Sequence, residues 1–327
     1  MSRRLSIVST MILFAFVAGA AGCSSATSPT LVPHSGAMGI QKAPLSLGTW
    51  TTKAPMPTAR EQLAAGVVNG RLYAVGGVDS LGYSNAVEAY DPATDTWSTK
   101  ASMPTARYEL AMGVVNGILY AVGGYNGIRN LNTVEAYNPA TNTWTTKASM
   151  PTPRYGLGVG VVNGILYAVG GIGIHGRSDT VEAYDPATDT WTTKASMPEA
   201  RGNIAAGVVN GILYAVGGYF NGAKRVNQAY NPATNTWATK ALMPTARDDL
   251  AASTLGQRLY AVGGYKNTKH FLNTVEAYNP ATDTWTTKTP MPTPRDGLAT
   301  RVVGDTLYAV GGNNSGYLNT VEAFSPR

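Results

Sequence analysis

The sequence has little cysteine, little charge and no long apolar run, and each shortage narrows the possible functions. Its single cysteine, Cys23, cannot form an intramolecular disulfide. The apolar run at residues 7–19 is too short for a comfortable transmembrane helix. Charged residues make up 13% of the chain, and this low fraction, together with many β-branched and aromatic residues, favours strands over helices.

The first 48 residues have the features of an export signal followed by a linker. Arg3 and Arg4 precede the apolar run, and small residues precede Cys23, which resembles a bacterial lipoprotein signal. We therefore expect residues 1–22 to be a signal peptide, Cys23 to be lipidated and residues 23–48 to be a flexible tether. The expected location is the cell envelope, outside the cytoplasm, with a lipid anchor as the only membrane attachment. An ordinary secreted protein and an uncleaved anchor are the alternatives.

Residues 49–327 repeat one hexapeptide, Leu-Tyr-Ala-Val-Gly-Gly, six times with a period near 47 residues. A period of this length indicates a repeat architecture. Within each repeat, two short apolar runs flank an Asn-Gly or Gly-X turn, and a third run leads through Asp-Pro, Asn-Pro or a related turn into a fourth. Each repeat is therefore predicted to form four antiparallel strands, named a to d. Strand d carries a lysine at one matching position, as edge strands often do. The hexapeptides begin at Leu72, Leu119, Leu166, Leu213, Leu259 and Leu307.

The repeat resembles the kelch repeat in three spaced features. A Gly pair ends strand b, a Tyr follows 12–14 residues later, and a Trp stands seven residues after the Tyr, as in Gly76-Gly77, Tyr90 and Trp97. The last repeat has Phe324 in place of the Tyr and lacks the Trp, whereas the chain begins with a lone strand d at Trp50. The resemblance implies an all-β, six-bladed β-propeller of four-stranded antiparallel blades. We expect the N-terminal strand to complete the last blade and close the ring.

Only one loop of the repeat varies in length. The b–c loop runs 12–14 residues from the second Gly to the Tyr or Phe, whereas the other spacings are constant. In an up-and-down sheet, the b–c loops and the d–a links share one face. Variation confined to that face indicates a functional surface. All seven tyrosines outside the repeat positions also fall there: Tyr83, Tyr108, Tyr125, Tyr155, Tyr219, Tyr265 and Tyr317.

These tyrosines predict a binding surface, because tyrosine offers rigid, amphipathic contact area. The alternative is that the rings merely pack the loops against the blades. The kelch resemblance implies that ligands contact the residue after Gly-Gly and the pair after the d–a arginine. The expected ligand is a protein or a cell-envelope glycan. The predicted ligand-binding residues are Tyr108, Glu109, Tyr125, Tyr155, Tyr219, Tyr265, Asn313 and Tyr317.

Catalysis is the less favoured alternative. Asp248, Asp249 and Asp296, which are expected near the channel, could bind Ca²⁺ or transfer protons, and Arg129 is a further weak catalytic candidate. Kelch relatives of the sialic-acid epimerase kind imply a sugar-modifying enzyme. The copper-oxidase kind needs a Tyr–Cys cross-link, which a cysteine-free domain cannot form. A passive structural or assembly platform is a third possibility. No metal or cofactor is expected.

The repeated charges are predicted to be scaffold. An arginine recurs in all six d–a links and a glutamate in five c strands, so we expect buried Arg–Glu pairs. The net charge is +6, and these arginines and the strand-d lysines supply twelve of the 25 basic residues. Because these twelve are distributed around the ring, no nucleic-acid partner is expected. The propeller is expected to be monomeric.

Overall fold

The structure is a computed structural model that describes residues 47–267 and 270–326. The predicted signal peptide, Cys23 and the tether up to residue 46 lie outside the described residues, so those predictions stay untested. The described residues form strands and turns. None of them forms a helix that could cross a membrane.

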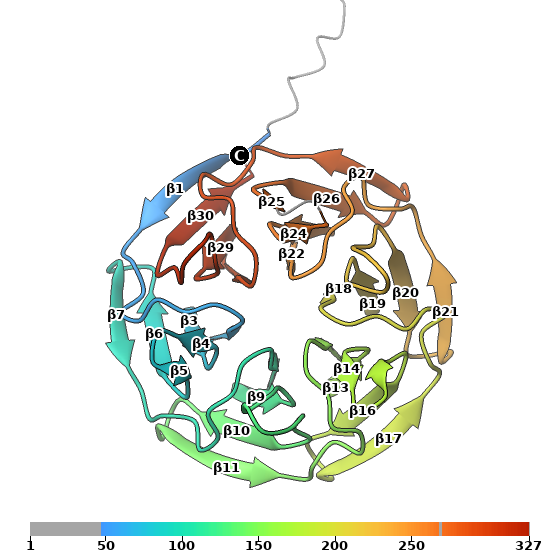
Figure 1. Ribbon diagram of the computed structural model, residues 1–327, viewed down its shortest axis with the longest axis horizontal. Helices are drawn as coiled ribbons and strands as arrows, with labels where there is room; N and C mark the ends of the chain where they lie inside the picture. The colour runs from blue at the N-terminus through green and yellow to red at the C-terminus, as the bar shows by residue number, and fades with distance from the viewer. Residues whose placement is uncertain (1–46, 268–269, 327) are drawn as a thin grey trace, which may run out of the picture. The chain divides into compact units, whose positions relative to one another are not determined.

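Six four-stranded antiparallel sheets are arranged in a ring (Figure 1), which confirms the predicted all-β propeller. In blades one to five the strands run from a at the channel to d at the rim in chain order. The blades comprise, in order: β2 (Ala64–Val68), β3 (Arg71–Val75), β6 (Val87–Asp91) and β7 (Thr96–Thr99); β8 (Ala111–Val115), β9 (Ile118–Val122), β10 (Val134–Asn138) and β11 (Thr143–Lys147); β12 (Gly158–Val162), β13 (Ile165–Val169), β16 (Val181–Asp185) and β17 (Thr190–Lys194); β18 (Ala205–Val209), β19 (Ile212–Val216), β20 (Asn227–Asn231) and β21 (Thr236–Thr239); β22 (Ala251–Leu255), β23 (Arg258–Val262), β26 (Val275–Asn279) and β27 (Thr284–Thr287); and β28 (Ala299–Val303), β29 (Thr306–Val310), β30 (Val321–Ser325) and β1 (Thr49–Lys53).

The N-terminal strand closes the ring as predicted. β1 pairs antiparallel with β30, with Trp50 opposite Phe324, and the blue and red strands lie side by side in Figure 1. Trp50 Nε1 donates to the Thr289 carbonyl at 3.0 Å, and Trp97 in blade one makes the equivalent bond to the Ala54 carbonyl at 2.9 Å. The last blade is therefore held to its neighbour by the same contact as an internal blade.

Neighbouring blades pack through close contacts of strand a with strand b of the next blade. A Cβ on Gly66 would lie 2.6 Å from Leu119 Cδ2, so this position of strand a admits no side chain without a shift. The a–b turns follow their predicted chemistry. Asn69 and Gly70 both have positive φ, at 49° and 73°, as a type I′ turn requires.

The predicted Arg–Glu pairs are buried in the d–a links. Arg60 is fully buried, and its Nη2 lies 2.6 Å from Glu88 Oε2, while its Nη1 donates to the Gly76 and Ala86 carbonyls. Its main-chain N–H donates to Leu318 O in the preceding blade, so the link joins two blades. Four more blades repeat the ion pair.

Three b–c loops contain a further two-stranded ribbon. These ribbons project from the b–c edge of blades one, three and five. Their strands are β4 (Val78–Asp79) with β5 (Gly82–Tyr83), β14 (Ile172–Gly173) with β15 (Gly176–Arg177), and β24 (Tyr265–Lys266) with β25 (His270–Phe271).

Candidate functional site: the loop face and the channel mouth

A closed ring of six backbone hydrogen bonds surrounds the end of the channel on the loop face. One residue from each d–a link donates its N–H to the carbonyl of its counterpart in the preceding blade, at 2.6–3.3 Å. All six have φ between 48° and 60°, the left-handed region that is costly for most side chains. We call these residues the mouth ring: Gln62, Glu109, Gly156, Asn203, Asp249 and Gly297.

The side-chain oxygen atoms of the mouth ring are partly paired and partly without a hydrogen-bond donor. Asp249 Oδ1 accepts from Gln62 Nε2 at 2.9 Å and from Asn203 Nδ2 at 2.8 Å. Glu109 Oε2 and Asn203 Oδ1 are buried and have no hydrogen-bond partner. Both of these oxygens lie within 3 Å of the point where a Cβ on Gly156 would stand. The ring lines a cavity of about 100 Å³.

Burial raises the pKa of five carboxyl groups at the mouth, and neighbouring carboxylates raise it further in four of them. Burial, together with Asp249 and Glu61, raises the pKa of Glu109 to about 8. Burial and the neighbouring carboxylates likewise raise the pKa of Asp296 to about 8 and that of Asp248 to about 7. The pKa of Asp249 is raised by burial, and that of Glu61 by burial and Asp249. These five residues are named the mouth carboxyls.

Four tyrosines form a continuous cluster over blades one to three. The rings of Tyr83 and Tyr108 stack with centroids 5.4 Å apart, and Tyr125 lies edge-on to both at 6.3 and 5.9 Å. Tyr155 extends the cluster, 5.7 Å from Tyr125. Tyr108 precedes Glu109 in the chain, and Tyr155 precedes Gly156, so the cluster adjoins the mouth ring. We call these four residues the tyrosine cluster.

The other predicted ligand-binding residues occupy a second region of the same face. Tyr219 and Tyr265 line a groove of about 430 Å³ that also contains Asp248, whose Oδ1 is buried and unpartnered. The Arg177 guanidinium lies 4.8 Å from the centre of the Tyr219 ring. Asn313 and Tyr317 form an isolated bridge in the b–c loop of blade six. The structure thus divides the predicted site among the tyrosine cluster, the mouth ring, this groove and the b–c loop of blade six.

Three exposed aliphatic residues on the loop face were missed by the sequence analysis, which followed the aromatic residues only. Leu81, Ile128 and Ile174 are 97%, 85% and 75% exposed at the b–c loops of consecutive blades. A large apolar residue in a short, otherwise polar loop was the available signal. Exposed apolar residues gathered on one surface are typical of an interaction site.

The weak catalytic candidates are only partly brought together. Asp249 lies close enough to raise the pKa of Asp248 and of Asp296, although burial is the larger cause for both. Arg129 instead lies exposed in the b–c loop of blade two, and no hydrogen bond or ion pair joins its side chain to these carboxyls. Arg177 is the arginine that lowers the pKa of Asp248. Within residues 47–267 and 270–326, no group of three or more His, Cys, Asp or Glu side chains is placed to hold a metal ion.

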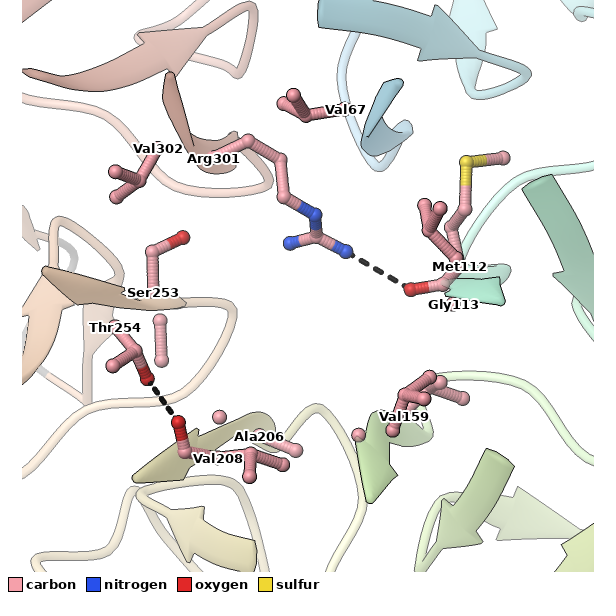
Figure 2. Close-up of a pocket in the computed structure, with 15 residues that line it drawn as sticks. Val67, Met112, Gly113, Val159, Ala206, Val208, Ser253, Thr254, Arg301 and Val302 are labelled. Carbon is pink, nitrogen blue, oxygen red and sulfur yellow. Dashed lines mark hydrogen bonds between the residues drawn. The ribbon is translucent and has the colours of Figure 1, made fainter. Parts of the chain in front are cut away.

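Valine, alanine and glycine make up most of the lining of the channel below the mouth. Figure 2 shows the charged residue of this lining, Arg301, which reaches across the channel from blade six to blade two. Its guanidinium donates to the Met112 carbonyl at 2.9 Å and to the Thr300 carbonyl at 2.8 Å. Burial lowers the pKa of Arg301 to about 10. The equivalent position is glycine in four blades and Ser253 in blade five.

The closed six-bladed ring, its Gly-Gly strand ends and its buried link arginines define a kelch-type β-propeller. The chain belongs to the KLHDC2/KLHL20/DRC7 kelch-repeats domain family, which matches residues 43–150, 103–242 and 192–327. Propellers of this class are generally protein-binding modules.

Two further similarities agree with this family. A kelch-like protein, terF, of Aspergillus terreus (strain NIH 2624 / FGSC A1156) is 43% identical over 61 residues, a match that spans 17% of this chain and 13% of that protein. The solved structure of YjhT superposes with a TM-score of 0.72 at 18% identity, covering 83% of this chain and 95% of that chain. At that identity, the likeness to YjhT concerns the fold alone.

Proposed function

We propose that this propeller is a binding module that docks a protein partner on its loop face. The observation that carries the proposal is that Leu81, Ile128 and Ile174 stand exposed in the b–c loops of blades one to three, the blades over which the tyrosine cluster extends. Exposed apolar side chains are typical of interaction sites, and tyrosine is enriched at protein interfaces, where a few large side chains supply most of the binding energy. The partner is expected to lie over blades one to three.

Selection of peptides on the immobilised propeller tests this proposal. We expect a random peptide library to yield binders whose affinity falls at least about tenfold when Leu81, Ile128 and Ile174 are all changed to Ser. Leu242→Ser is the matched control, because Leu242 is also exposed but lies in the link between blades four and five. Peptides that bind the triple variant and the wild type equally well would contradict the proposal and favour a passive platform.

We further propose that the module acts outside the cytoplasm, anchored through a lipid on Cys23. The support is the signal-like arrangement of basic, apolar and small residues before Cys23. Expression in a bacterial host with radiolabelled palmitate should label the wild type and not Cys23→Ser. Equal labelling of the two proteins, or labelling of neither, would contradict lipidation at this residue.

A sugar-modifying activity is a second candidate. It is favoured by the pKa of Asp248, about 7, and that of Asp296, about 8, because proton transfer is most effective near the working pH. Anomer exchange of N-acetylneuraminic acid, followed by NMR, tests it with wild type and Asp248→Asn. A wild-type rate equal to the uncatalysed rate rules this substrate out. A glycan that binds without turnover would instead make the propeller a carbohydrate-binding module.

A further inference from the structure

The mouth ring offers hydrogen-bond acceptors to a ligand but few donors. Glu109 Oε2 and Asn203 Oδ1 are buried without partners and converge on the space above Gly156. The Asn203 amide is oriented by its Nδ2, which donates to Asp249, so its oxygen is left to face the cavity. A buried acceptor without a donor is costly, and a ligand that brings donors would remove that cost.

The charge of the site is also one-sided. None of the ion pairs found in the described part of the chain includes a mouth carboxyl. The raised pKa of Glu109, Asp248 and Asp296 reflects burial together with repulsion between neighbouring carboxylates. Arg177, which lowers the pKa of Asp248, lies over Tyr219 and adjoins the groove. A cation at the ring would offset the repulsion that the fold imposes.

The dimensions of the site restrict which kind of cation can bind there. A cavity of about 100 Å³ admits the end of one side chain and not a folded segment. An ammonium group is compact and has three donors on a flexible apolar stem, whereas a guanidinium is a wider planar fork. The rings of Tyr108 and Tyr155, which adjoin Glu109 and Gly156 in the chain, are available to contact such a stem.

We infer that the mouth ring binds the ammonium group of a lysine side chain belonging to the docked protein, with Glu109, Asn203 and Asp249 as its acceptors. This inference rests on the proposed function, because it identifies one anchor residue of the partner. The inference also explains why the ring carries acidic side chains, which the fold itself does not need. Gly156 and Gly297 occupy two of the six ring positions and make the same backbone hydrogen bonds without a carboxylate side chain.

The chain itself supplies the conservative variants for a test. Glu109→Gln introduces the residue present at Gln62, and Asp249→Asn introduces the residue present at Asn203, so the ring already accommodates both at the same left-handed φ. The matched control is Asp185→Asn, on the turn face, where other blades have Asn138, Asn231 and Asn279. Each variant replaces one carboxyl group with an amide, and thermal unfolding of each checks that it is folded.

Three probes measure binding by NMR titration of the isotope-labelled propeller: Nα-acetyl-lysine N-methylamide, its norleucine counterpart and its Nε-acetylated form. We expect the lysine probe alone to shift the amide resonances of the mouth ring, with a Kd on the order of millimolar. We expect its affinity to fall about tenfold or more in Glu109→Gln and in Asp249→Asn, and to stay within about twofold in Asp185→Asn.

The inference is overturned if the norleucine or acetylated probe binds as well as lysine, or if no probe shifts the ring. It is also overturned if calcium chloride alone shifts the ring and the lysine probe does not. The peptide selection separates the two proposals. If the selected peptides bind whether or not they contain a lysine, the docking face is supported and the lysine anchor is contradicted. If the lysine probe binds and no peptide does, the ammonium site is supported and the protein partner is contradicted.

Discussion

Glu109 forms no ion pair with any cation among residues 47–267 and 270–326, and this should appear in the pH dependence of stability. Its pKa in the folded protein is raised to about 8, mainly by burial. An acid whose folded pKa is raised holds its proton more tightly when folded, so the free energy of unfolding falls as pH rises from the unfolded pKa to the folded one.

We therefore expect Glu109→Gln to match the wild type near pH 5 and to be more stable near pH 9, by about 1–3 kcal/mol after allowance for solvent screening. Urea unfolding at both pH values measures the difference. Equal stability of the two proteins at pH 9 would show that Glu109 ionises without cost in the folded state. Asp185→Asn, made in parallel, should show no such gain.

At the scale of one element, the d–a link of blade four departs from its five counterparts in a coordinated way. Arg201 bonds to Gln228 Oε1 at 2.7 Å instead of to a glutamate. Glu199 stands where the other links have threonine and raises the pKa of Arg201, against a larger opposite effect of burial. The negative charge that offsets the buried arginine has thus moved from the strand to the link.

This exchange predicts strong coupling between two substitutions. Glu199→Thr alone should destabilise by about 1 kcal/mol, because it removes a negative charge that favours the buried cation from a partly exposed position, where it also pairs with Lys224 at 3.3 Å. Adding Gln228→Glu to that variant recreates the arrangement of the other blades and should recover most of the loss. A double-mutant cycle by urea unfolding should give a coupling energy of about 1–3 kcal/mol. Additive effects would show that Glu199 does not balance Arg201.

At the scale of the whole molecule, β1 determines whether the ring is closed. It provides the d strand of blade six, through its pairing with β30 and the bond from Trp50 to the Thr289 carbonyl. A chain lacking residues 1–53 should lose its cooperative melting transition and associate through the exposed edge of β30. A chain lacking residues 1–46 retains β1 and should melt like the full chain. Indistinguishable melting of the two truncated chains would contradict closure by β1.

The ring of six blades could be predicted because the sequence features that indicate its strands and turns recur in every repeat. A lone strand d before the first blade and a missing one after the last were sufficient to indicate closure. The position of the extra tyrosines on one face also followed from strand order. The mouth ring could not be predicted, because its hydrogen bonds join residues in different blades and require left-handed backbone at Gln62 and Glu109, which sequence does not indicate. Whether tyrosines in different loops touch likewise depends on blade geometry.

The division of the predicted site has the same cause. Tyr125 and Tyr219 have equivalent positions in their repeats, but one ring lies among other tyrosines and the other beneath Arg177. The b–c loops of blades one to three are equal in length, those of blades four to six differ from them by one residue, and the side chains of the loops decide which rings meet. The position of a tyrosine in the repeat identifies the face on which it lies, whereas the composition of the loops determines which side chains it contacts there.

Hydrogen exchange of the propeller, free and bound to a library-selected peptide, tests the central claim most directly. If the loop face is the docking surface, the peptide should slow exchange in the b–c loops at residues 79–83, 126–130 and 173–176 and at the mouth ring. Exchange at the opposite turns, residues 116–117 and 163–164, should be unchanged. Protection confined to those turns, with the b–c loops exchanging as in the free protein, would contradict the account.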